Sequence, residues 1–180
     1  MNDEKILYEG KIFEVLQYPM KVGTKEVMFE KVRRSPGTRL LIVKKNKILL
    51  TKEYRHELKK NDYRLPGGKV FDTLKEYHQA KDRDITQEAL RAAKKECLEE
   101  TGLSPTKIIL FDILRAGATI EWDLFYFLVT EFEVKEQKLE EGEQIQVEWK
   151  TFSEAKHMCL NKEISEDRTI GVLLRFLLTK

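Results

Sequence analysis

Three carboxylates, Glu96, Glu99 and Glu100, lie close together in the 180-residue chain. Spacings of three and four residues place side chains on one face of a helix, one turn apart. Like charges gathered in this way repel one another. A hard divalent cation would relieve the repulsion, because Mg²⁺ binds oxygen ligands and is commonly held by carboxylates together with substrate phosphates. The spacing therefore indicates either a Mg²⁺ site or an acidic, solvated helix face.

The helix that carries these carboxylates has signals at both ends. Asp84 and Gln87 fit a capping box, with Thr86 as a second candidate cap. Gly102 is typical of a helix C-terminus. Residues at helical spacing predict a buried stripe, which consists of Ala89, Leu90, Ala93, Cys97 and Thr101. The three carboxylates lie off this stripe and are expected to face away from the core.

The N-terminal part of the chain is predicted to be β-structure. Residues 6–34 alternate in a way that indicates an antiparallel hairpin or meander, with Pro19 and Gly23 punctuating it. A turn then sets a boundary between an N-terminal β segment, 1–36, and a main domain, 37–180. A segment of this size cannot bury both of its faces alone, so we expect it to pack on the main domain or on a second subunit.

The main domain alternates between strand and helix signals. Apolar runs at 39–44 and 47–52 predict a hairpin buried on both faces. Residues 57–62 are expected to form a polar loop, and 71–83 show no clean strand pattern. Further predicted elements are strands at 107–114, 124–129 and 144–150, a short helix from Thr151 and a last helix at 167–178. This order indicates a mixed α/β layered domain.

Composition narrows the class of protein. The net charge is only +2, which gives no electrostatic case for nucleic acid as the main partner. Cys97 and Cys159 have no metal-type neighbours and are expected to be free thiols in a reducing compartment. No signal peptide or membrane-spanning run is present in this sequence. We therefore expect a cytoplasmic protein that acts in solution, without a membrane.

Leu65-Pro66-Gly67-Gly68 and Lys95–Leu103, taken together, resemble the sequence box of the Nudix hydrolases. The family pattern ends in Arg-Glu-apolar-x-Glu-Glu-x-Gly-apolar. Here Lys95 stands at the arginine and Cys97 at the apolar position. The resemblance implies the Nudix fold, which is an α/β fold with a mixed β-sheet sandwiched between helices.

The first half of the box departs from the family pattern. Counting back from Lys95 reaches Gln87, with Glu88 beside it, where the family has its first glutamate. Residues 69 to 86 separate Gly68 from Gln87, where the family has five, which implies an insertion of about 13 residues. Lys95 keeps a charge but not the fork of an arginine. Whether Gln87 or Glu88 takes the first glutamate's place stays open.

Further residues resemble the ADP-ribose pyrophosphatase branch of the family. Tyr54-Arg55 follows a strand as a Tyr-Arg pair does there, and Gly117 and Glu121 match its acidic loop. In that branch the N-terminal strands help to form a dimer, with substrate near the subunit boundary. The resemblance therefore implies a homodimer.

The resemblance also implies roles for individual residues. Glu96 and Glu100 are expected to bind Mg²⁺, with Mn²⁺ as an alternative, and Glu99 to bind it directly or through water. The carbonyl of Gly67 is a further candidate ligand, because a glycine turn allows close backbone approach. Glu121 ranks first as general base, since it lies on a separate loop, and Glu96 ranks second.

Substrate contacts are expected upstream of the helix. Arg55 is a candidate diphosphate contact, unless it is an ordinary surface arginine. Arg64 could reach phosphate or face solvent, and Tyr54 could stack on a base or pack. Trp122 could cover the substrate or fill the core. The inserted Tyr77 and His78 could form a lid or an unrelated excursion.

The expected reaction is Mg²⁺-dependent cleavage of ADP-ribose or a related nucleoside diphosphate sugar to a nucleoside monophosphate and a sugar phosphate. One alternative keeps the chemistry and changes the substrate to another nucleoside diphosphate derivative. Another is a non-hydrolytic nucleotide sensor, which the altered positions Gln87 and Lys95 would suit. The intact carboxylates argue against a sensor, because a pure binder need not retain repelling charges.

Overall fold

The computed structural model describes residues 4–56, 58–80, 82–139 and 142–179. Its central sheet contains β4 (Gly37–Lys44), β5 (Lys47–Arg55), β6 (Lys60–Arg64), β7 (Leu103–Leu114), β9 (Leu124–Val134) and β10 (Ile145–Thr151). The order is β10-β5-β4-β9-β7, with β6 paired to β5. β4 and β9 run parallel, whereas the other neighbours are antiparallel. The predicted mixed sheet is confirmed.

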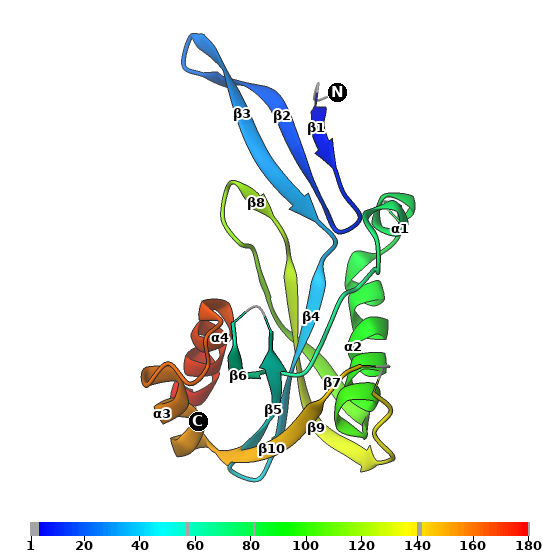
Figure 1. Cartoon of the computed structure of the whole chain (residues 1–180), viewed down its shortest axis with the longest axis vertical. Helices are drawn as coiled ribbons and strands as arrows, with labels where there is room; N and C mark the ends of the chain where they lie inside the picture. Colours follow the sequence, from blue (N-terminus) through cyan, green and yellow to red (C-terminus); the bar gives the residue numbers. More distant parts are fainter. Residues whose placement is uncertain (1–3, 57, 81, 140–141, 180) are drawn as a thin grey trace.

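Helices cover both faces of this sheet (Figure 1). The long helix α2 (Ile85–Thr101) packs on one face, and α3 (Phe152–Leu160) and α4 (Asp167–Leu178) pack on the other. Alternate residues of β4 supply the two cores, since Leu40 and Ile42 pack on the α2 side and Leu41 on the other. None of the described helices combines the length and apolar character that a membrane span needs.

Asp84 caps α2 and Gly102 ends it, as expected, but among the described contacts the Gln87 side chain makes no hydrogen bond that would complete the predicted capping box. The Asp84 side chain accepts hydrogen bonds from the backbone N–H groups of Thr86 and Gln87. Gly102 ends the helix in the left-handed conformation, with φ 67°. Cys97 in this helix and Cys159 in α3 are buried free thiols, as predicted.

Two local predictions were wrong. Residues 60–62 of the predicted loop 57–62 instead begin strand β6 (Lys60–Arg64), because they complete the hydrogen bonding of the adjacent edge of β5. Residue 57 lies outside the described part. Pro19 does not interrupt its strand, which continues to Val22. Its position is tolerated because it lies opposite Met28, beyond the residues that pair with β1.

A second sheet rises from one end of the molecule (Figure 1). Its strands are β1 (Lys5–Glu9), β2 (Phe13–Val22), β3 (Lys25–Arg34) and the short β8 (Ile120–Glu121). β1, β2 and β3 are antiparallel as predicted, but β8 joins β3 in parallel. The N-terminal segment is thereby attached to a loop of the main domain.

The inserted segment also reaches this sheet. It contains α1 (Leu74–Gln79), whose first residue is buried and donates its backbone N–H to the carbonyl of Lys11 at 3.1 Å. Tyr77 and His78 lie on this helix, and His78 contacts Glu14 of β2. The insertion therefore packs on the N-terminal sheet.

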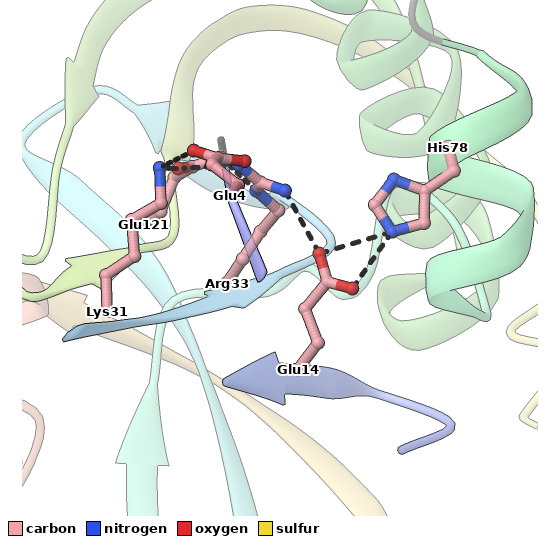
Figure 2. A network of polar contacts seen from close by, with 6 residues as sticks. All are labelled: Glu4, Glu14, Lys31, Arg33, His78 and Glu121. Atoms are coloured by element: carbon pink, nitrogen blue, oxygen red, sulfur yellow. Dashed lines mark hydrogen bonds and ion pairs between the residues drawn. The ribbon is translucent and has the colours of Figure 1, made fainter. Parts of the chain in front are cut away.

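A network of charged side chains joins these parts, and we call it the Arg33 network (Figure 2). Arg33 contacts Glu121 at 2.6 Å, Glu4 at 2.8 Å and Glu14 at 3.1 Å. Lys31 binds Glu4 and Glu121, both at 2.8 Å. Glu14 is only 1% exposed and also lies 3.3 Å from His78. One arginine thus links β2, β8 and the residue that precedes β1 to β3.

Ion pairing sets the charge of the acids in this network. Burial opposes ionisation of Glu121, but hydrogen bonds from Arg33 and Lys31 outweigh it and hold its pKa below the ordinary value. The hydrogen bond from Lys31, with further help from Arg33, also lowers the pKa of Glu4. Both carboxylates therefore stabilise the folded state in their ionised form.

Replacing Arg33 with Met should lower the free energy of unfolding by about 3–5 kcal/mol, because the buried Glu14 carboxylate loses its arginine. Lys31→Met is the matched control and should cost about 1 kcal/mol or less, since its carboxylate partners are more exposed. Denaturant unfolding at neutral pH measures both values. Equal losses in the two variants would contradict a central role for Arg33.

The stability difference between wild-type protein and Arg33→Met should depend on pH. The stabilisation from Glu4 and Glu121 is complete above the unfolded-state pKa of about 4.3 and is lost as the pH falls through their lower folded-state values. Wild-type stability should therefore fall more steeply in this acid range than the stability of Arg33→Met. Parallel curves for the two proteins would show that the network does not set the acid response.

The N-terminal sheet exposes many large apolar side chains. They are Ile6, Leu7, Tyr8, Ile12, Phe13, Met20, Val22, Val27 and Met28. A group of large exposed apolar side chains on one sheet is typical of an interaction site. We therefore keep the homodimer as a prediction, with this sheet in the interface.

Sedimentation velocity should show a dimer that Met20→Lys/Val27→Lys converts to monomer. Met20 and Val27 lie directly opposite each other on β2 and β3, so the double variant places two repelling charges on one face. Val134→Lys, at an exposed apolar position of β9, should remain dimeric. A monomeric wild-type protein would overturn the prediction.

Candidate active site

The acidic end of α2 is fixed against the turn Leu65–Gly68, which we call the glycine turn. The backbone N–H of Gly67 donates to Oε2 of Glu100 at 2.7 Å. Gly67 has φ +137°, and a Cβ there would lie 2.2 Å from the carbonyl oxygen of Thr38. A Cβ on Gly68 would lie 2.0 Å from Oε1 of Glu96. A glycine is required at Gly67 by the close approach to the backbone of β4, whereas Gly68 lies against the Glu96 side chain of α2.

Two of the three carboxylates are unfavourably placed for negative charge. Burial, followed by the charge of Glu99, raises the pKa of Glu96 to about 7. Burial also raises the pKa of Glu100 to about 8, with Glu96 adding to the effect and the Gly67 N–H opposing it. Glu99 is paired with Lys95 at 3.4 Å. A divalent cation would offset both shifts, because it favours the ionised carboxylates, so these oxygen donors fit one.

The side-chain positions of the three carboxylates do not form a metal coordination shell. Within the described ranges, no three acidic, histidine or cysteine side chains converge on one point as a metal site. The carbonyl of Gly67, a predicted ligand, instead accepts a hydrogen bond from Nη1 of Arg39 at 2.9 Å. The same Nη1 also donates to the carbonyl of Thr38. Metal binding would therefore require side chains to reorient, and the ligand roles stay predictions.

A cleft of about 690 Å³ opens in front of these residues. Glu96, Glu99 and Glu100 line one part of it. The lining also includes positively charged residues from several elements, namely Arg34, Arg39, Arg55, Arg64, Lys69, Arg91 and Lys95. Carboxylates able to hold a cation and cations able to bind phosphate thus share one cleft.

The predicted substrate residues divide between two locations. Arg55 and Arg64 line the cleft, and each is held by a neighbouring acid: Arg55 contacts Glu53 at 2.8 Å, and Arg64 contacts the buried Asp62 at 2.6 Å. Tyr54 lies instead at a smaller neighbouring pocket and is 46% exposed. The structure therefore brings the two arginines, but not Tyr54, to the carboxylates.

Glu121 lies outside the residues that line the cleft. Its carboxylate belongs to the Arg33 network, and it borders a separate pocket together with Tyr18, Lys31 and Tyr77. The next residue, Trp122, does line the cleft. Glu121 could reach substrate only if this loop moved, so its role as general base stays a prediction.

The place of the first box glutamate can also be described. Glu88 lines the cleft and forms ion pairs with Arg91 and Arg83. Gln87 takes part in the helix start through its backbone N–H. Lys95 reaches Glu99. Of the two candidates for the first box glutamate, Glu88 lines the cleft and Gln87 does not. The Glu88 carboxylate is paired with Arg83 and Arg91.

Sequence reasoning missed Arg34 and Arg39 as cleft residues. Arg34 ends β3 and Arg39 lies in β4, far along the chain from the acidic helix. A strand-end arginine has no distinctive spacing, so only the folded structure reveals that both residues line the cleft.

Comparison with known proteins gives a consistent result for the family. The model of the NUDIX domain matches residues 33–170, which is most of the chain. No curated protein sequence matches the chain. Among solved structures, one described as "Crystal structure of ADP compounds hydrolase" superposes with a TM-score of 0.70 at 14% identity, over 98% of this chain and 92% of that one. This likeness shows a shared fold, and the domain match shows that the chain belongs to the Nudix family.

Proposed function

We propose that the protein is a divalent-metal-dependent hydrolase that cleaves the diphosphate of ADP-ribose or a related nucleoside diphosphate sugar. One observation carries this proposal: partly buried, mutually repelling Glu96 and Glu100 share a cleft with several arginines. Such a cleft suits a polyanion together with a cation. The fold likeness to an ADP compounds hydrolase supports an ADP-containing substrate.

The residues divide the work as follows. Glu96, Glu99 and Glu100 would hold Mg²⁺ or Mn²⁺, and such a cation supplies charge neutralisation for the phosphate oxygens. Arg55 and Arg64 would bind and orient the diphosphate. A carboxylate accepts a proton from the attacking water as the new P–O bond forms and the bridging P–O bond breaks. The products are a nucleoside monophosphate and a sugar phosphate.

The location of the carboxylates favours Glu96 over Glu121 as the proton acceptor. Glu96 lines the cleft, whereas Glu121 is engaged by Arg33 and Lys31 outside it. Glu121 would have to leave both cations to contact water near the diphosphate.

Wild-type protein should release nucleoside monophosphate from a panel of nucleoside diphosphate derivatives in the presence of Mg²⁺ or Mn²⁺, and EDTA should abolish release. Glu100→Gln should lower kcat/KM about a hundredfold or more, as removal of one preorganised electrostatic group commonly does. Glu131→Gln, which removes an exposed carboxylate on β9, is the control. Tight binding of one panel member without hydrolysis would favour the sensor instead.

A comparison of Glu96→Gln with Glu121→Gln identifies the base. Loss of a general base commonly lowers the rate by 10²–10⁴-fold. We expect Glu121→Gln to lower kcat by less than about tenfold and Glu96→Gln to lower it by the larger factor. Since Glu96 is also a candidate ligand, Mg²⁺-dependent thermal stabilisation must be measured for both. A large kcat loss in Glu121→Gln with unchanged Mg²⁺ stabilisation would restore Glu121 as the base.

A further inference from the structure

Trp122 is enclosed by two arginines, and we call the three residues the arginine–tryptophan stack. The guanidinium carbons of Arg34 and Arg168 both lie 3.9 Å from the centre of the indole ring. Two planar cations cannot occupy the same ring face at this distance, so each covers one face. Trp122 therefore has no free ring face on which a nucleobase could stack. Its indole ring holds Arg34 in place instead.

The stack presents hydrogen-bond donors that have no acceptor in the protein. Nε of Arg34 and Nε1 of Trp122 are buried without a hydrogen-bond partner among the described residues, and so is Nε of the nearby Arg39. No ion pair joins Arg34 to a described carboxylate. A buried donor without an acceptor costs about 1–3 kcal/mol. Nε of Arg55, in the same cleft lining, is a fourth such donor among the described residues. Together they indicate a missing acceptor.

The charges around Arg34 point to the same conclusion. Burial, followed by repulsion from Arg168 and Arg39, lowers the pKa of Arg34. Arg168 differs because Glu166 lies 3.6 Å away and its Nη1 donates to the carbonyl of Trp122 at 3.3 Å. Arg168 is thus fixed behind the indole. Arg39 is attracted by Glu96 and Glu100, whereas no described carboxylate acts on the pKa of Arg34, which keeps an unbalanced positive charge in the cleft lining. An anion in the cleft would offset it.

Two glycines place the stack close to the acidic site. A Cβ on Gly37 would lie 3.6 Å from Nε1 of Trp122 and 3.2 Å from the carbonyl oxygen of Gly68. Gly68 itself touches Glu96 on its other side, as described above. The free indole N–H and the Glu96 carboxylate are therefore separated by little more than two glycine backbones, a span that one diphosphate-containing substrate can bridge.

Resting on the proposed function, we propose that Arg34, Arg39 and the indole N–H of Trp122 form an anion subsite that binds a phosphoryl group of the substrate across the cleft from Glu96. Arg168 is a positioning residue that holds the indole from behind. The subsite binds phosphoryl oxygens that lie next to Arg34 and Trp122. Binding there does not require a metal ion at the carboxylates.

Calorimetric titration with inorganic pyrophosphate in EDTA tests the subsite without catalysis. Wild-type protein should bind, and Arg34→Gln should weaken binding at least tenfold, as loss of a charge-assisted hydrogen bond commonly does. Trp122→Phe keeps a ring between the arginines but removes the N–H and should weaken binding several-fold. Arg175→Gln, which makes the same charge change on the outer side of α4, should not alter the affinity.

Two further measurements separate local from global effects. Thermal unfolding identifies any variant that fails to fold, and Arg34→Lys, which keeps the charge, should then retain part of the affinity. Arg168→Gln should weaken binding and Arg168→Lys should restore part of it, because a cation behind the ring is what the position supplies. Unchanged affinity in folded Arg34→Gln, or an equal loss in Arg175→Gln, would overturn the subsite.

The outcome is distinguishable from that of the proposed function. If the panel is hydrolysed while pyrophosphate affinity does not depend on Arg34, the function stands and the subsite is wrong. If no panel member is hydrolysed but affinity depends on Arg34 and not on Arg175, the subsite stands and the hydrolytic function is wrong.

Discussion

The hydrogen bond from the backbone of Gly67 to Glu100 is the constraint on which the site depends. It joins the end of the acidic helix to the glycine turn, and the turn in turn lies against β4. A side chain at Gly67 would collide with the backbone of β4, and one at Gly68 would displace the Glu96 carboxylate. The Glu100 carboxylate is therefore held by the backbone of the glycine turn, while Glu96 and Glu99 have no hydrogen bond to that backbone among the described contacts and can respond to a cation. A rigid helix end with adjustable carboxylates suits a site that must bind metal and phosphate together.

The elements with strong local signals could be predicted from the sequence. The helix α2 has a capping aspartate, an apolar stripe and a terminal glycine, and it forms where expected. The strands on either side of the turn at 45–46 carry continuous apolar runs that only a sheet covered on both faces can bury. The acidic face of α2 was also evident, since three glutamates at helical spacing are informative without any tertiary structure.

Other features arise only from tertiary pairing. The residues of β6 have no apolar alternation, and they form a strand because the edge of β5 lies beside them. The ion pairs of Glu121 involve residues nearly ninety positions away, so its sequence neighbours gave no indication that it would be engaged. Arg34 and Arg39 reach the cleft through the packing of β3 and β4, and no spacing rule connects them to the acidic helix. Physical chemistry identified which residue types could bind metal, but the fold determines which cations share their cleft.

The alternation of side chains at the end of β3 has a consequence for the whole molecule. Lys31 and Arg33 point to one face, where they bind Glu121, while Arg34 points to the other and stacks on Trp122. Adjacent arginines of one strand thus serve the N-terminal sheet and the cleft respectively. A one-residue slip of β3 against β2 would exchange these two environments, placing an anion-seeking arginine in the network and withdrawing one from the cleft. The β2–β3 hairpin has ten paired positions. The register of this pairing therefore determines which arginine side chain points into the cleft.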